Sequence, residues 1–191
     1  EQRITKAGFD SLNIPYNGSN TFFGEKLNMI QYKFQNEIQD TIQVYNIDRN
    51  PSIIVADCNN LKTVKIETEE PFTLVKYMDC KNLENAPLFA NSTLVIVNCE
   101  SFYPVFRPDM RFENVVVGQR RISSVFFNNL NCLQLQLVSC IYENEILYLI
   151  KCVADKLYLI NSKVKSVIFP EGVKEVAFDD VKKLKQLILK P

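Results

Sequence analysis

The sequence predicts a mainly β solenoid, in which two short parallel strands make up each coil of about 21 residues. Apolar residues recur in pairs about every ten to eleven residues, and alternate pairs recur every 19 to 22 residues. The composition, with 47% hydrophobic and 23% charged residues, is that of a folded domain with a sizeable core.

Each apolar pair predicts one short strand, which we call a rung. With position 1 of the first rung at Asn50, position 4 is apolar in all fourteen rungs, and position 6 is apolar in thirteen. The exception at position 6 is Arg107. Two strand residues separated by one point to the same face, so we expect positions 4 and 6 to fill the core.

A full coil needs two rungs, because ten residues are too few for a strand, a turn, a returning strand and a second turn. We therefore expect two parallel sheets, called face A and face B, with about 4.8 Å between coils. Face A consists of the rungs that begin at Asn50, Phe72, Asn91, Phe112, Cys132, Ala154 and Val173, and face B of those that begin at Leu61, Leu83, Phe102, Ile122, Asn144, Val164 and Leu184.

The first fifty residues follow the repeat less tightly, as terminal repeats commonly do. We interpret residues 1–26 as an irregular N-terminal cap and residues 27–191 as one continuous repeat solenoid. A helix over residues 24–35 is the alternative for part of this region. The pairs that fit the repeat here are Leu12 with Ile14, Ile30 with Tyr32, and Ile42 with Val44.

The stretch 165–191 resembles the irregular leucine-rich repeats of the BspA-like type, which alternate an L-x-x-L-x-I-P strand with a second short V-x-x-I segment. Here Val167, Ile168, Phe169 and Pro170 match the end of the first segment, followed by Val173 and Val176, and by Leu184, Leu187 and Leu189. The resemblance implies a right-handed, leucine-rich-repeat-like solenoid that binds proteins and has no catalytic residues. Elsewhere only the spacing matches, so a two-sheet β-solenoid of another family is the alternative.

Several functional classes are not expected from the composition. Twenty-two basic and twenty-two acidic residues cancel, which gives no overall field to attract nucleic acid. The chain contains no histidine, which excludes Ser-His-Asp triads, Cys-His dyads and histidine-containing zinc sites. No apolar run is long enough to span a membrane, and no phosphate-binding glycine motif occurs, so we expect no cofactor.

Four of the six cysteines share position 9 of face A: Cys58, Cys80, Cys99 and Cys140. Arg120 and Ser162 occupy the same position in other coils. Small side chains at such a turn can pack inside and bond the backbone, so we expect a ladder of buried free thiols. A disulfide and a metal site are the alternatives.

Charged residues give weaker signals. Two adjacent carboxylate pairs, Glu69–Glu70 and Asp179–Asp180, could serve glycoside hydrolysis if they flanked a groove, but we expect solvated turns. Arg107, between Pro104 and Pro108, is expected to mark a bulge. Arg120 and Arg121 are expected in a solvated turn rather than in an anion site.

The candidate binding residues are those at position 5 of face B, between the two core positions. From the third rung onward they are all large and apolar: Phe106, Phe126, Tyr148, Ile168 and Ile188. The earlier Pro87 is expected to break its rung, and face A carries a mixed set at this position. A stripe of this kind predicts a non-enzymatic module that binds a protein partner or forms a homodimer. The alternatives are a structural repeat domain of a larger protein, whose neighbour covers the stripe, and a carbohydrate-active β-solenoid.

Overall fold

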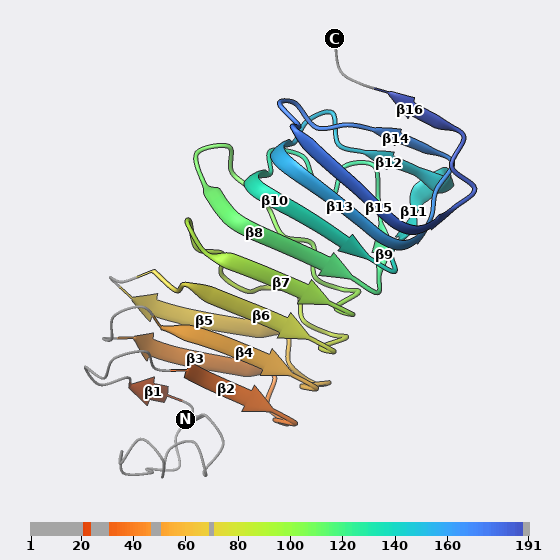
Figure 1. Ribbon diagram of the computed structural model, residues 1–191. Coiled ribbons are helices and arrows are strands. Elements are labelled where there is room, and N and C mark those ends of the chain that lie inside the picture. The colour runs from red at the N-terminus through yellow and green to blue at the C-terminus, as the bar shows by residue number, and fades with distance from the viewer. Residues whose placement is uncertain (1–20, 24–30, 47–50, 69–70, 189–191) are drawn as a thin grey trace. The chain divides into compact units, whose positions relative to one another are not determined.

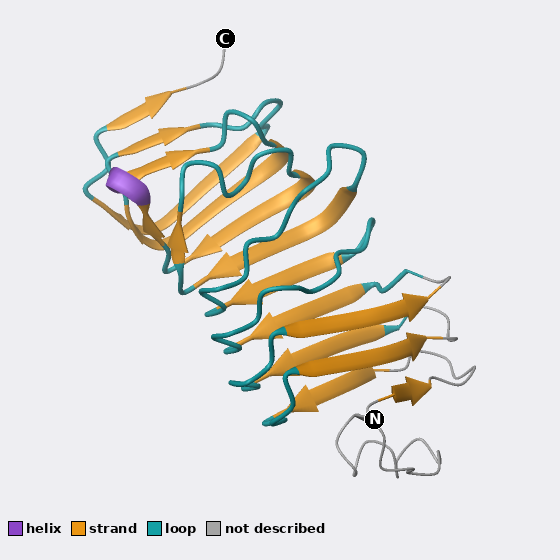
Figure 2. Cartoon of the chain, turned by 180° about the vertical axis from the view of Figure 1, so that it is seen from behind, coloured by secondary structure: helices purple, strands orange, loops and turns teal. Residues whose placement is uncertain are grey.

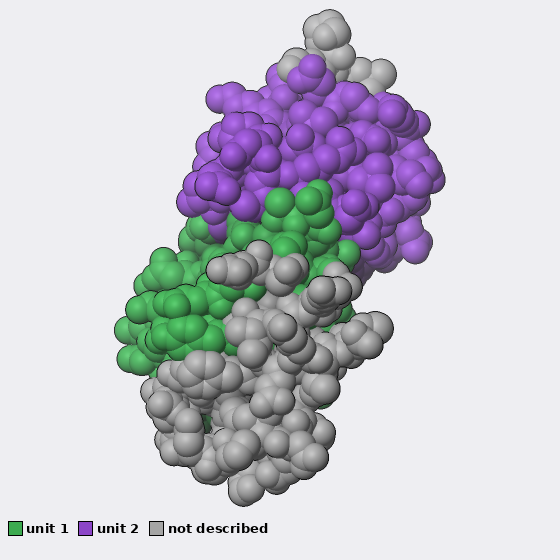
Figure 3. Space-filling model, turned by 90° about the vertical axis from the view of Figure 1, so that its left-hand side faces the viewer, with its two compact units in different colours: residues 1–103 green, residues 104–191 purple. Residues whose placement is uncertain are grey.

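The computed structural model describes residues 21–23, 31–46, 51–68 and 71–188, and these fold as a mainly β solenoid, with 53% of the residues in strands. Its parallel strands form about 7 turns spaced about 20 residues apart, which confirms the predicted solenoid (Figures 1 and 2). In the described part, the one helical element is the 3-10 turn η1 (Glu143–Glu145). The chain divides into two compact units, Glu1–Tyr103 (unit 1) and Pro104–Pro191 (unit 2), coloured separately in Figure 3.

Unit 1 contains two parallel sheets whose strands run in opposite directions, so the chain passes along one sheet and returns along the other (Figure 1). Face A here is formed by β2 (Gln31–Gln35), β4 (Ser52–Ala56), β6 (Leu74–Met78) and β7 (Thr93–Val97). Face B is formed by β1 (Thr21–Phe23), β3 (Thr41–Asn46) and β5 (Thr63–Thr68).

Unit 2 repeats this arrangement with longer face A strands. Face A consists of β8 (Arg111–Gly118), β10 (Asn131–Val138), β13 (Val153–Lys163) and β15 (Glu175–Lys182). The short strands β9 (Arg121–Ile122) and β11 (Ile141–Tyr142) follow the corner of their coils. Face B consists of β12 (Ile146–Tyr148), β14 (Ser166–Ile168) and β16 (Gln186–Ile188).

The predicted register of face A is correct. Ile53 pairs with Val75 and Val75 with Leu94 in unit 1, and all three are fully buried. The position 4 residues of β8, β10 and β13 in unit 2 are aligned and fully buried in the same way: Val115, Leu135 and Leu157. The hydrophobic core therefore lies between faces A and B, as the spacing of apolar pairs predicts.

The predictions for the first fifty residues are only partly confirmed. Ile42 and Val44 are buried and pair with β5, as expected. In β2, however, the buried pair is Tyr32 with Phe34 rather than Ile30 with Tyr32, and the helix alternative is wrong for residues 31–35 because they form a strand. The predicted register was displaced by two residues, which preserves the alternation and so could not be detected from it.

Most of the predicted cap lies outside the described residues, as do Leu12, Ile14 and Ile30. Within the predicted cap, β1 pairs in parallel with β3, so face B begins before residue 27. The predicted boundary between residues 26 and 27 lies outside the described residues, so the division into a cap and one continuous solenoid stays a prediction. The compact units divide at Tyr103–Pro104.

The predicted register of face B fails in two rungs. Val105 and Val125 were expected in the core but are 83% and 63% exposed, while Phe106 and Phe126 are buried. Neither segment is a strand: turn hydrogen bonds run from Met110 N to Arg107 O and from Phe126 N to Ser123 O in their place. Strict two-residue alternation holds only in extended strands, so it assigned these side chains to the wrong side.

Pro87 has the effect predicted for it. Residues 83–90 form no strand, and Glu84 and Asn85 bond the preceding coil at Lys62 and Val64 around a single bridge between Thr63 and Asn85. A prolyl nitrogen cannot donate to a ladder, which is consistent with this interruption.

Each face A strand reaches a corner residue with left-handed backbone conformation, directly after the strand or, in β13 and β15, two residues before its last residue. The eight corner residues have φ between 46° and 55°, and they are Asn36, Asp57, Asp79, Asn98, Gln119, Ser139, Asn161 and Asp180. Asn and Asp, which tolerate this conformation best after glycine, account for six of them. The corner N–H groups donate to the next coil, for example from Asp57 to Met78 O at 3.0 Å and from Ser139 to Ile160 O at 3.0 Å. The corners thus define the stacking register as well as the change of direction.

Candidate interaction surface

Three of the five predicted binding residues stack on the outer side of face B in unit 2. Strand pairing aligns Tyr148 with Ile168 and Ile168 with Ile188. Their neighbours Leu147 and Val167 are fully buried, so alternation along the strand directs Tyr148 and Ile168 outward, and pairing with Ile168 places Ile188 on the same side of the sheet. Tyr148 and Ile168 are half-buried and Ile188 is exposed. We call Tyr148, Ile168 and Ile188 the outer strip.

The other two predicted binding residues are not on this surface. Phe106 is 3% exposed and Phe126 is 6% exposed, so the prediction that they project outward is wrong. Their rings form an edge-on cluster: Phe106 lies 6.0 Å from Phe112 and 6.5 Å from Phe126, and Phe126 lies 4.8 Å from Phe127, between ring centroids. These phenylalanines are core residues of unit 2.

An open depression of about 310 Å³ adjoins the outer strip at Tyr148. Its apolar lining consists of Val125, Tyr148 and Ile150, and Val125 and Ile150 are well exposed. Its polar lining consists of Ser124, Asn128, Glu143, Asn144 and Lys151. The N–H of Ser124 donates to Glu143 Oε2 at 2.9 Å, which joins two lining residues of the depression, one from the turn before β10 and one from η1.

A group of charged residues lies beside the start of β12 and β14. Lys165 Nζ lies 3.0 Å from Glu145 Oε2, and Lys183 Nζ lies 3.7 Å from Glu145 Oε1. The hydrogen bond from Lys165 lowers the pKa of Glu145 below its ordinary value. The nearby Lys183 ammonium lowers the pKa of Lys163. This edge of the outer strip is therefore polar and carries more ammonium than carboxylate groups.

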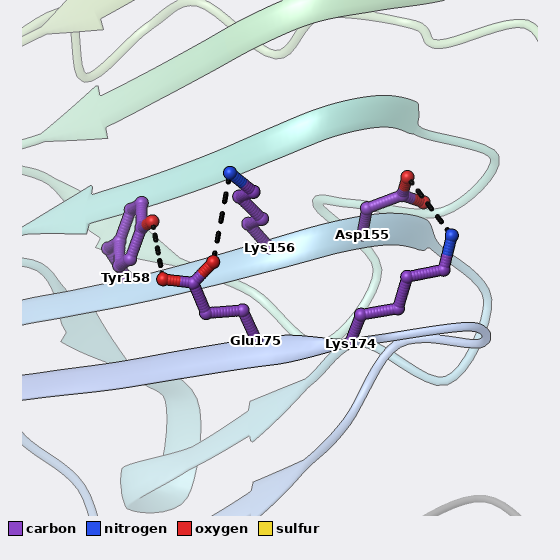
Figure 4. Close-up of polar contacts among 5 residues, drawn as sticks. All are labelled: Asp155, Lys156, Tyr158, Lys174 and Glu175. Carbon is purple, nitrogen blue, oxygen red and sulfur yellow. Dashed lines mark hydrogen bonds and ion pairs between the residues drawn. The ribbon is translucent and has the colours of Figure 1, made fainter.

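The outer side of face A differs between the two units. In unit 2 it carries polar contacts on β13 and β15: Lys156 Nζ lies 3.7 Å from Glu175 Oε2, the Tyr158 hydroxyl bonds Glu175 Oε1 at 3.1 Å, and Lys174 Nζ lies 3.7 Å from Asp155 Oδ2 (Figure 4). These contacts join β13 to β15. Opposite charges therefore stack across neighbouring coils.

In unit 1 the outer side of face A is largely apolar, which the sequence reasoning missed. The half-buried apolar residues of β4, β6 and β7 are Ile54, Ala56, Leu74, Met78, Val95 and Val97. Positions 3 and 7 of each rung point outward together with position 5, but only position 5 was considered. Reading all three positions would have identified this second apolar surface.

The predicted cysteine ladder is present. Cys58, Cys80, Cys99 and Cys140 are buried free thiols, and each directly follows a corner residue. The thiol of Cys58 donates to Ala56 O and that of Cys80 to Met78 O, both at 3.2 Å. Burial raises the pKa of Cys140 to about 11, which keeps the thiol protonated near neutral pH. The described residues contain no group of three or more potential metal ligands.

Arg120 occupies the ladder position in its coil, but it is not in a solvated turn as predicted. It is 2% exposed, its guanidinium carbon lies 4.5 Å from the centroid of Phe126, and its Nε donates to Arg121 O at 3.1 Å. The same inward turn that buries Phe126 provides this aromatic face for the cation. Arg107 is exposed in an irregular segment and lies 3.7 Å from Asp109; the predicted bulge is not formed, because this segment is a turn rather than a strand.

Comparison with known protein families, curated proteins and solved structures finds no match to this chain. The resemblance of residues 165–191 to leucine-rich repeats therefore stays a prediction. No helix in the described ranges is long and apolar enough to cross a membrane.

Proposed function

We propose that this chain is a non-enzymatic interaction module that binds an extended segment of a partner protein along the outer strip. The observation that carries the proposal is the stacking of Tyr148, Ile168 and Ile188 beside an open depression. Outward residues of a solvated sheet are ordinarily polar, so an apolar row on adjacent strands favours a contact surface.

The depression specifies what the partner segment should carry. Its volume of about 310 Å³ is at the lower end of ligand sites, which suits one bulky apolar side chain packed among Val125, Tyr148 and Ile150. The amides of Asn128 and Asn144 offer both donors and acceptors to a backbone lying across the opening. Alternate side chains of an extended segment, about 7 Å apart, can then reach the depression and the strip together.

Two alternatives are retained. The strip of a structural repeat domain would pack against a neighbouring domain of a larger protein, which uses the same apolar contacts. A carbohydrate-active solenoid has less support, because Glu143 is the one carboxylate among the lining residues identified and glycoside hydrolysis ordinarily uses two.

The test is selection of random twelve-residue peptides displayed on phage against the immobilised protein. We expect enrichment of peptides with bulky apolar residues at alternate positions. Fluorescently labelled copies of these peptides should bind Tyr148→Ser and Ile168→Ser at least about 10-fold more weakly than the unmodified protein. Val105→Ser, which changes an exposed valine outside the strip, is the matched control and should bind normally.

Two results would contradict the proposal. One is the absence of any selected apolar peptide. The other is selected peptides whose binding is weakened by Val95→Ser rather than by Tyr148→Ser, which would assign the interface to the outer side of face A in unit 1.

A further inference from the structure

Three lysines and one glutamate gather where unit 2 turns from face A to face B. Lys165 Nζ and Lys183 Nζ lie 3.0 Å and 3.7 Å from the two carboxylate oxygens of Glu145. The side chain of Lys163 contacts that of Lys183. We call Glu145, Lys163, Lys165 and Lys183 the lysine cluster. When all four groups are ionised, the cluster carries an excess of about two positive charges.

The backbone holds these side chains on three stacked coils. The N–H of Lys165 donates to Glu145 O at 2.8 Å, so two of the coils are bonded directly at the cluster. Glu145 and Lys183 have φ of 57° and 66°, a left-handed conformation that is uncommon for both residue types. Lys165 lies in the middle coil, and its side chain is 53% exposed although β14 has paired strands on both sides. The cluster therefore opens to the side of the solenoid.

The positive charge of the cluster is only partly offset within it. Glu145 is shared between Lys165 and Lys183. Lys163 instead meets the side chain of Lys183, and this contact between like groups lowers the pKa of Lys163. Ammonium groups so close together repel one another, and an anion that bridges them would remove the repulsion. The arrangement favours a ligand with two negative charges over a ligand with one.

We propose that the lysine cluster binds the phosphate group of a phosphorylated serine or threonine in the partner segment. This inference rests on the proposed function and adds the chemistry that accompanies the apolar side chain of that segment. A phosphate monoester carries about −1.5 to −2 charges at pH 7, which matches the excess charge of the cluster, whereas a carboxylate carries a single charge. Its three terminal oxygens can accept from Lys163, Lys165 and Lys183 together.

The cluster lies close enough to the outer strip for one segment to reach both. Glu145 directly follows Asn144, which lines the depression, and Lys165 precedes Ile168 of the outer strip by three residues. Three residues of extended chain span about 10 Å. A phosphorylated residue about two to four positions from the bulky apolar residue would therefore reach the lysines while the apolar side chain fills the depression.

Titration with inorganic phosphate tests the site without any peptide. Isotope-labelled lysine reports each ammonium-bearing side chain by NMR, while chloride keeps the ionic strength constant. We expect saturable shifts of Lys163, Lys165 and Lys183, and no saturable shift of Lys81, an exposed lysine of unit 1. The double variant Lys163→Gln with Lys183→Gln should lose the response of Lys165. No saturable shift in the cluster, or an equal response of Lys81, would overturn the proposal.

Fluorescent peptides test whether the phosphate belongs to the partner segment. Apolar peptides selected against the outer strip are synthesised with serine, aspartate or phosphoserine at the proposed spacing. Phosphoserine should strengthen binding at least about 10-fold relative to serine, and aspartate should strengthen it less. The gain should disappear in the double variant and persist in the control Lys81→Gln, and circular dichroism should show that both variants are folded.

Three results would overturn this assignment: equal gains from aspartate and phosphoserine, a gain that the double variant retains, or tighter binding to phosphatidylserine vesicles than to the phosphopeptide. The two proposals also fail separately. If apolar peptides bind but phosphoserine adds nothing, this inference alone is wrong. If no apolar peptide is selected, the proposed function is wrong and the partner segment with it, and the phosphate titration shows whether the lysine cluster binds the anion by itself.

Discussion

The corner thiols behave as small core residues that also supply one hydrogen bond each. Burial raises the pKa of the ladder thiol Cys140 to about 11, compared with about 8.5 in an unfolded chain. A thiolate at this position would need a charge in an apolar site. The ladder is therefore suited to packing rather than to nucleophilic chemistry near neutral pH.

This difference predicts how stability depends on pH. Above about pH 8.5 the unfolded chain loses thiol protons that the folded chain keeps, so the free energy of unfolding falls as pH rises toward 11. The loss should be on the order of 1 kcal/mol per pH unit for each such thiol. Urea unfolding at pH 7.5, 9 and 10 under reducing conditions measures it. Cys140→Ala should show a shallower dependence, and an unchanged slope would refute this contribution of Cys140.

The corners can be recognised in the sequence from the residue that precedes each ladder cysteine, although the sequence analysis did not include it. Asp or Asn directly precedes the ladder cysteine at Asp57, Asp79 and Asn98, and all three have positive φ. The position of the thiols was predicted, but the reason for the residue before them was not. A repeated Asp-Cys or Asn-Cys dipeptide at a fixed place indicates a left-handed corner, because these side chains tolerate that backbone.

Backbone conformation at the corner is the basis of a second prediction. Asp57→Val places a β-branched residue at φ 55° and should cost about 1–2 kcal/mol of stability. Asp57→Gly is the matched control, because glycine adopts this conformation freely, and its cost should be clearly smaller. Chemical denaturation of both variants compares them. Equal losses would mean that the Asp57 side chain, rather than its backbone, stabilises the corner.

At the scale of strands and turns, the sequence predicts rungs well where they are extended. Leu135 and Leu157 lie where the two-residue alternation places them. The prediction fails at Val105 and Val125, because the alternation is not valid in a turn. Nearby proline and asparagine residues indicate that a turn is possible, but they do not show which side chain it buries. Tyr148, Ile168 and Ile188 of the predicted stripe are aligned as expected, because β12, β14 and β16 are strands.

The contrast between Leu147 and Val125 gives a third prediction. Both were assigned to position 4, but Leu147 is fully buried and Val125 is 63% exposed. Leu147→Ala should therefore cost about 2–5 kcal/mol, because it removes packed methyl groups and leaves a cavity. Val125→Ala should change stability by less than about 0.5 kcal/mol. Thermal or urea unfolding distinguishes them, and similar costs would restore the original register for this rung.

For the molecule as a whole, the sequence predicts a solenoid but not which surface is open. Phe126 is buried because its segment forms a turn, in which the Phe126 N–H donates to Ser123 O, and because its ring packs against Phe106 and Phe127. The contact with Phe106, twenty residues earlier, is a consequence of three-dimensional packing. A repeat register describes one coil at a time and does not contain it.

Hydrogen exchange should distinguish a strand with two paired neighbours from a strand with one. In a solenoid, each coil is stabilised mainly by its neighbours, so strands paired on both sides should open less often. Among the described strands, β10 is paired with β8 and β13, whereas β15 is paired with β13 alone. We therefore expect the amides of β15 to exchange faster than the amides of β10 in this chain. Equal protection of the two strands would contradict the dependence on neighbouring coils.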